Sequence, residues 1–231
     1  MEELFFLLRI LHIVCGSLAL IAGTLSIINN KGSRFHRITG IIFVYALLIV
    51  AVSAIVITQI PGHSNLFLLI IGVFAAYLAG SGYRALFLKQ LNPLPQPKKI
   101  DWAISGIMAV FAVYFVLYGV KVFFINKNSM GLVAIIFALI AISLVYGDYK
   151  TFTTPPSEKY FWLFRHLIRM IAGVIATYTA FLVVNNKFLP PLVAWLAPTV
   201  IGTAVIFGFI RYYNSKFSSG EKVRDILIIR I

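Results

Sequence analysis

The side chains best suited to chemistry in this sequence are its four histidines: His12, His36, His63 and His166. An imidazole can ligate haem iron or a metal ion through one ring nitrogen while its other nitrogen hydrogen-bonds to the protein. Two histidines on different helices can together hold one haem. We expect His36 and His166 to share one membrane level, and we predict that this pair binds a haem or a metal ion. His12 lies farther outward along its helix, where it would belong to a second site.

Acidic and basic side chains meet at one end of the expected helices. Three of the seven acids fall there: Asp101, Asp148 and Glu158. An ionisable group at membrane depth usually has a function, and we predict a polar inner rim of Arg37, Asp101, Asp148 and Arg169 in which Asp148 pairs with Arg169. The other interpretation is a charged rim that only anchors the helices at the lipid headgroups. The two histidines would then hydrogen-bond to these acids and bind no ligand.

The elements that must position these residues are membrane-spanning helices. The sequence is 61% hydrophobic and 12% charged, against about 45–50% and 25% in soluble domains. Apolar runs of this length without strand-type alternation form helices, because a helix satisfies its own backbone in lipid. We predict an all-α bundle of seven transmembrane helices, forming one domain over residues 1–212, with a basic tail over 213–231. The expected spans are Leu4–Ile28, Arg34–Ile60, Leu66–Leu88, Ile100–Phe124, Met130–Tyr149, Tyr160–Val184 and Pro191–Tyr212.

The distribution of basic residues predicts how the bundle lies in the membrane. Four of the 20 lysines and arginines fall on the side of the N-terminus, and the other 16 fall on the opposite side. This bias is typical of a protein whose N-terminus is outside and whose C-terminus is cytoplasmic. It also accounts for the net charge of +13 without nucleic acid as a partner. We expect the tail to lie against anionic lipids of the inner leaflet. Protein partners stay open.

Small residues share a helix face with two of the histidines. Gly16, Ala19 and Gly23 follow His12 at helical spacing, and Gly173 lies on the face of His166. Small residues allow membrane helices to approach closely, so one interpretation is helix packing alone. The other is that these faces leave room for a flat cofactor. Gly40, four residues after His36, would then let a ring lie against the second helix. His36 falls in the first turn of that helix if Ser33 is its N-cap.

The chain resembles a family of uncharacterised bacterial multi-pass inner-membrane proteins, a family defined as a domain of unknown function. The resemblance rests on short motifs spread over nearly the whole chain: His12-x3-Gly16, Lys31-Gly32-x3-His36-Arg37-x2-Gly40, Ser81-Gly82-Tyr83-Arg84-Ala85-Leu86 and His166-x2-Arg169-Met170. It implies a bacterial inner-membrane protein with His12, His36 and His166 at pattern positions. It implies no activity.

Three functions remain open on the sequence alone. The first is a redox or electron-transfer protein that binds haem b through histidines. The second is a carrier or sensor of a small molecule, with the inner Asp, Arg and His groups as its polar site. The third is an assembly subunit of a membrane complex without a cofactor. Motifs of zinc proteases, serine hydrolases, P-loop nucleotide-binding proteins and dithiol oxidoreductases are missing from the sequence. Whether the chain is an enzyme stays open.

Overall fold

The fold is a bundle of seven long helices. The structure, a computed structural model, describes residues 2–63, 65–89 and 96–221. Each helix is long and apolar enough to cross a membrane, and the described ranges contain no strand. The predicted all-α membrane fold is therefore confirmed. The helices are α1 (Glu2–Ile28), α2 (Arg34–Ile57), α3 (Leu66–Arg84), α4 (Lys99–Val120), α5 (Met130–Thr153), α6 (Phe161–Asn185) and α7 (Pro191–Ser218).

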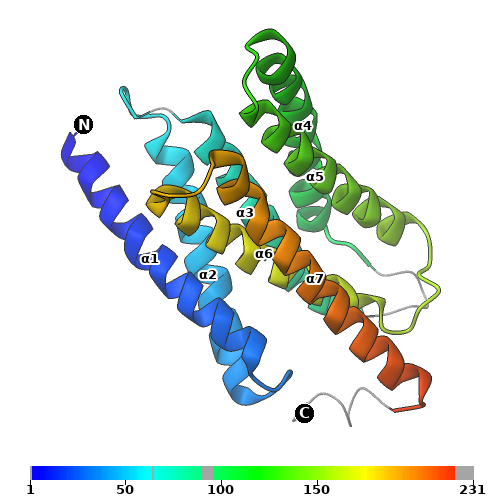
Figure 1. Ribbon diagram of the computed structural model, residues 1–231. Helices are drawn as coiled ribbons and strands as arrows, with labels where there is room; N and C mark the ends of the chain where they lie inside the picture. Colours follow the sequence, from blue (N-terminus) through cyan, green and yellow to red (C-terminus); the bar gives the residue numbers. More distant parts are fainter. Residues whose placement is uncertain (1, 64, 90–95, 222–231) are drawn as a thin grey trace.

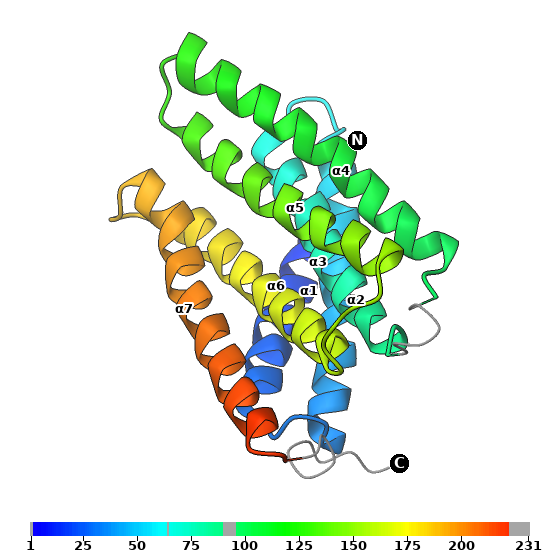
Figure 2. The same cartoon turned by 90° about the vertical axis from the view of Figure 1, so that its right-hand side faces the viewer.

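Helices α3 and α6 form the centre of the bundle. Helix α3 packs against α2, α4 and α6, and α6 packs against α1, α3 and α7. Consecutive helices also form three antiparallel pairs, namely α1 with α2, α4 with α5, and α6 with α7 (Figures 1 and 2). The loops after α1, α3 and α5 lie at one end of the bundle, because successive helices run in alternating directions (Figure 1). Two of the four histidines, His36 and His166, line a cavity near that end.

Helix ends differ from the predicted spans where local contacts decide them. A short 3₁₀ helix (Ala85–Phe87) follows α3, and a π-helical turn (Lys121–Ile125) extends α4. Helix α2 ends at Ile57, short of the predicted Ile60, whereas α7 continues past Tyr212 to Ser218. Tyr213 is buried and Phe217 stacks on Tyr160 with ring centroids 4.0 Å apart. These contacts extend the helix into the predicted tail, and residues 222–231 lie outside the described part.

The turn between α1 and α2 fixes the start of the second helix. Gly32 has a φ of 79°, the left-handed conformation that glycine adopts without a steric penalty. Ser33 Oγ accepts a hydrogen bond from the His36 backbone N–H at 3.1 Å, so Ser33 is the N-cap, as predicted. Lys31 Nζ donates to the carbonyls of Ser26 (3.1 Å) and Ile27, both in the last turn of α1. A lysine there satisfies carbonyls that lack helical partners.

Candidate functional site

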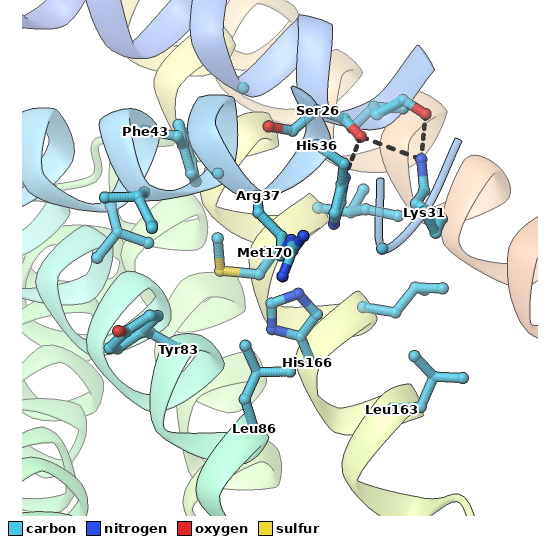
Figure 3. A pocket seen from close by; sticks show the side chains of 18 of the residues that line it. Ser26, Lys31, His36, Arg37, Phe43, Tyr83, Leu86, Leu163, His166 and Met170 are labelled. Atoms are coloured by element: carbon cyan, nitrogen blue, oxygen red, sulfur yellow. Dashed lines mark hydrogen bonds between the residues drawn. The ribbon is translucent and has the colours of Figure 1, made fainter. Parts of the chain in front are cut away.

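His36 and His166 line one cavity of about 410 Å³ (Figure 3). Its walls come from the end of α1, the start of α2, the end of α3, the first half of α6, and Tyr213 of α7. Most of the lining is apolar or aromatic, including Phe43, Leu163 and Met170. A volume of this size suits a small organic ligand or cofactor. The structure thus brings together the two histidines that the sequence pairs, from helices 130 residues apart in the chain.

Both histidines are oriented by a backbone carbonyl. His36 Nδ1 lies 3.0 Å from the Ser26 carbonyl oxygen, and His166 Nδ1 lies 2.9 Å from that of Gly82. Because a carbonyl oxygen only accepts, each Nδ1 must carry the hydrogen. In the neutral ring the lone pair is then on Nε2. Neither Nε2 has a hydrogen-bond partner among the residues that the structure describes. A donated Nδ1–H with a free Nε2 is the arrangement found in histidines that ligate metals.

The charges on the cavity wall are all positive. Lys31, Arg37 and Lys89 line it, and within the described ranges no aspartate or glutamate does. Burial lowers the pKa of Lys31 from 10.5 to about 8, because desolvation disfavours the ammonium form. Lys89 Nζ lies 4.6 Å from the centroid of the Trp162 ring, and both residues line the cavity. An anionic group on a ligand would therefore be favoured here, next to an otherwise apolar interior.

Two glycines on the cavity wall show which of the small residues serve helix packing and which leave room for a ligand. A Cβ at Gly23 would lie 2.8 Å from Val174 Cγ2, so close packing requires this glycine. A Cβ at Gly40 would first meet Ser26 Oγ at 3.9 Å, so the surface of α2 is open there. Close packing thus accounts for Gly23. Gly40 leaves room beside His36.

The two remaining histidines lie elsewhere. His12 Nδ1 is 2.9 Å from Ser53 Oγ, and His12 is not on the cavity wall, as its expected outward position requires. Because Ser53 donates its own hydrogen to the Val50 carbonyl, its oxygen accepts from His12. His63 stacks on Phe5 with ring centroids 3.5 Å apart, outside the bundle interior. The His12 ring is therefore explained by a hydrogen bond and the His63 ring by stacking.

A second polar group lies inside the bundle, centred on Asp148 of α5. Its carboxylate is 0% exposed and pairs with Arg165 and Arg169 of α6. It also accepts from the hydroxyls of Tyr77 (2.8 Å) and Ser105 (2.6 Å). We call these five residues the Asp148 cluster. The predicted Asp148–Arg169 pair is confirmed, but it is sealed among α3, α4, α5 and α6 and does not lie at an exposed interface.

The four residues predicted as one polar rim are therefore divided among three places. Arg37 lines the cavity, and Asp148 with Arg169 lies in the cluster. Asp101 is 3% exposed and forms a two-pronged ion pair with Arg84 at 2.7 and 2.8 Å, which joins the ends of α3 and α4. The alternative in which these acids hydrogen-bond to the cavity histidines is wrong. Asp101 and Asp148 are buried and pair with arginines, and the two histidines hydrogen-bond to backbone carbonyls.

Comparison with protein-family models, curated proteins and solved structures finds no significant match to this chain. The family resemblance that the motifs suggest stays a prediction. So does ligand binding by His36, His166 and His12. Within the described ranges, histidines, cysteines and acids form no group of three that could hold a metal ion. A haem is the better match to two imidazoles, because the porphyrin supplies the other four ligands to iron.

Sequence reasoning missed the hydroxyl groups of the Asp148 cluster. Tyr77 and Ser105 lie 71 and 43 residues from Asp148 in the chain. Arg169 also donates to Ser81 Oγ at 2.6 Å. One signal was available, since Tyr77 and Ser81 are four residues apart and share a helix face, as do Arg165 and Arg169. Two apolar helices that each carry such a polar face are predicted to pack with these faces together.

Proposed function

We propose that this protein is a membrane-embedded haem b protein that transfers electrons. The observation that supports the proposal best is the pair of imidazoles on one cavity, each with Nδ1 donating to a carbonyl and Nε2 free. A b-type haem has an apolar ring and two carboxylates. The cavity offers an apolar lining and three cationic side chains without an acid among its described lining residues.

The residues on the cavity wall would have different roles in binding the haem. His36 and His166 would hold the haem iron through Nε2, and the Ser26 and Gly82 carbonyls keep those rings oriented. Arg37 and Lys89 would bind the propionates. Lys31, which donates to the carbonyls of Ser26, Ile27 and Asn29, would contribute its positive charge to the cavity wall. When bound, the haem would supply reversible one-electron chemistry, and the apolar walls would tune its reduction potential by limiting contact with water. The protein's own contribution is binding, orientation and electrostatics.

The test is an absorption spectrum of the full chain. The protein would be purified from cells supplied with iron and a haem precursor, and spectra would be recorded oxidised and after dithionite. We expect a reduced α-band that is lost in both His36→Ala and His166→Ala. His12→Ala is the matched control, because it removes a membrane-embedded imidazole away from the cavity and should keep the band. A folded protein that stays colourless when haem is added would refute the proposal.

A carrier or sensor of an anionic organic molecule is the second candidate, and the unopposed cations on the cavity wall favour it. The same experiment separates the two functions. A carrier would be colourless, and its ligand would be found by mass spectrometry of the denatured sample. Loss of that ligand in Arg37→Gln would support the carrier function.

We further propose that the chain lies in a bacterial inner membrane with its N-terminus outside and its cavity near the cytoplasmic face. The split of 4 basic residues against 16 supports this orientation. The basic tail would contact anionic lipids, although residues 222–231 lie outside the described part. A reporter that is active only in the periplasm, fused after Ile231, should be silent. Periplasmic activity of the fusion would refute the orientation.

A further inference from the structure

Helix α6 carries the Asp148 cluster and the cavity on neighbouring faces. Arg165 and Arg169, four residues apart, both pair with Asp148. His166 and Met170 follow each of them by one residue and line the cavity. One residue is about 100° of rotation in an α-helix. Any rotation of α6 that disturbed the cluster would therefore also turn His166 away from its present direction.

The two faces meet the same short segment of α3. Arg169 Nη1 donates to Ser81 Oγ at 2.6 Å, and His166 Nδ1 donates to the carbonyl of the next residue, Gly82, at 2.9 Å. At Gly82 the helices are in close contact, since a Cβ there would lie 3.0 Å from both Arg169 Cβ and Met170 Sδ. The Arg169–Ser81 bond and the His166–Gly82 bond are thus neighbouring links in one α3–α6 contact.

Stability alone does not explain why a membrane protein would bury such a cluster. Replacing a buried ion pair by apolar residues of similar volume is often neutral or stabilising. What the ion pair adds is direction, because charge-assisted hydrogen bonds are short and geometrically demanding. Arg169 makes four contacts at once, to Asp148, Tyr77, Ser81 and the Leu144 carbonyl. Together these contacts restrict the rotation and the depth of α6.

We propose that Arg169 is a positioning residue for His166. By holding Ser81 it keeps the Gly82 carbonyl against His166 Nδ1, and so keeps the Nε2 lone pair directed into the cavity. This inference rests on the proposed function only for the identity of the ligand that Nε2 would bind. Which ring nitrogen of His166 carries the hydrogen depends on the chain alone and can be measured without a ligand.

The test is NMR of the full chain, labelled with ¹⁵N-histidine, in lipid nanodiscs without added haem. The His166 signal is assigned by its loss in His166→Gln. We expect the wild type to carry the hydrogen on Nδ1 alone, and Arg169→Gln to show a mixture of Nδ1–H and Nε2–H forms. Arg165→Gln is the matched control. It removes a guanidinium from the same helix and the same carboxylate, and it should leave the His166 signal unchanged.

Ser81→Ala keeps the ion pair and the Arg169–Tyr77 bond and removes the bond between Arg169 and Ser81. This variant provides the test if Arg169→Gln does not fold. It should shift the His166 signal in the same direction. An unchanged signal in both variants, an equal change in Arg165→Gln, or a wild-type hydrogen on Nε2 would each overturn the proposal.

Haem titration of the same samples separates this inference from the proposed function. Loss of a partner that orients a metal-binding histidine typically weakens binding about 10–100-fold, and we expect that loss for Arg169→Gln. If the wild type binds no haem but the NMR results hold, the proposed function fails and the positioning role stands. If the wild type binds haem and Arg169→Gln changes neither signal nor affinity, the positioning role fails alone.

Discussion

Replacing Asp148 with asparagine keeps the shape of the side chain and removes its charge. The carboxylate is fully buried between Arg165 and Arg169. Removing one partner of a buried ion pair costs about 3–5 kcal/mol, because the other charge stays buried without compensation. Here two guanidinium groups would stay buried, and the hydroxyls of Tyr77 and Ser105 would lose a charged acceptor. We therefore expect the free energy of unfolding to fall by an amount at the upper end of that range, about 5 kcal/mol.

The measurement is an SDS titration of the detergent-solubilised protein followed by far-UV circular dichroism. Glu158→Gln is the control, because Glu158 is an exposed acid near the same end of the bundle. Its free energy of unfolding should change by less than about 0.5 kcal/mol, as for most surface substitutions. A loss of less than about 1 kcal/mol in Asp148→Asn would show that the two arginines do not depend on the carboxylate. The reasoning about the Asp148 cluster would then be refuted.

Two further predictions concern the α3–α6 contact and the cavity. Gly82→Ala should lower the free energy of unfolding by about 1–3 kcal/mol, as overpacking does, because its Cβ would press on Arg169 and Met170; Gly106→Ala, where nothing lies within 4 Å, should not lower it. Binding of haem or another anionic ligand should weaken as the pH rises through about 8, because Lys31, whose pKa is about 8, then loses its charge. A titration of affinity against pH checks this, and a step that persists in Lys31→Gln would contradict it.

The helices were predictable from the sequence because their cause is local. A run of apolar residues long enough to cross the membrane specifies a helix whatever it packs against. The end of α7 was not predictable in this way. Asn214, Ser215 and Lys216 are polar and indicate a loop, yet Tyr213 and Phe217 on the same helix pack against α6 and keep it helical.

The site was predictable only in part, because its geometry depends on contacts between distant segments. Helix depth alone placed His36 and His166 at one level, and the structure puts them on one cavity. The carbonyls that orient these histidines could not be predicted from the sequence, since every residue has a carbonyl. Depth alone also suggested that the acids would be exposed. Whether an acid such as Asp148 is sealed or solvated depends on which helix covers it, and that is a property of the assembled bundle.

The Asp148 cluster also bears on how the chain enters the membrane. Arg165 and Arg169 lie in the first half of α6. An arginine at the centre of a membrane helix opposes insertion of the isolated helix by about 2.5–3.5 kcal/mol, and one nearer the end opposes it by less. Their counter-charge is near the end of α5, across one short turn of the chain. Helices α5 and α6 would therefore insert more easily together, as a hairpin whose two arginines already share the Asp148 carboxylate near its closed end, than one after the other. The ion pair that orders the finished bundle would then also decide which pair of helices leaves the translocation machinery as a unit.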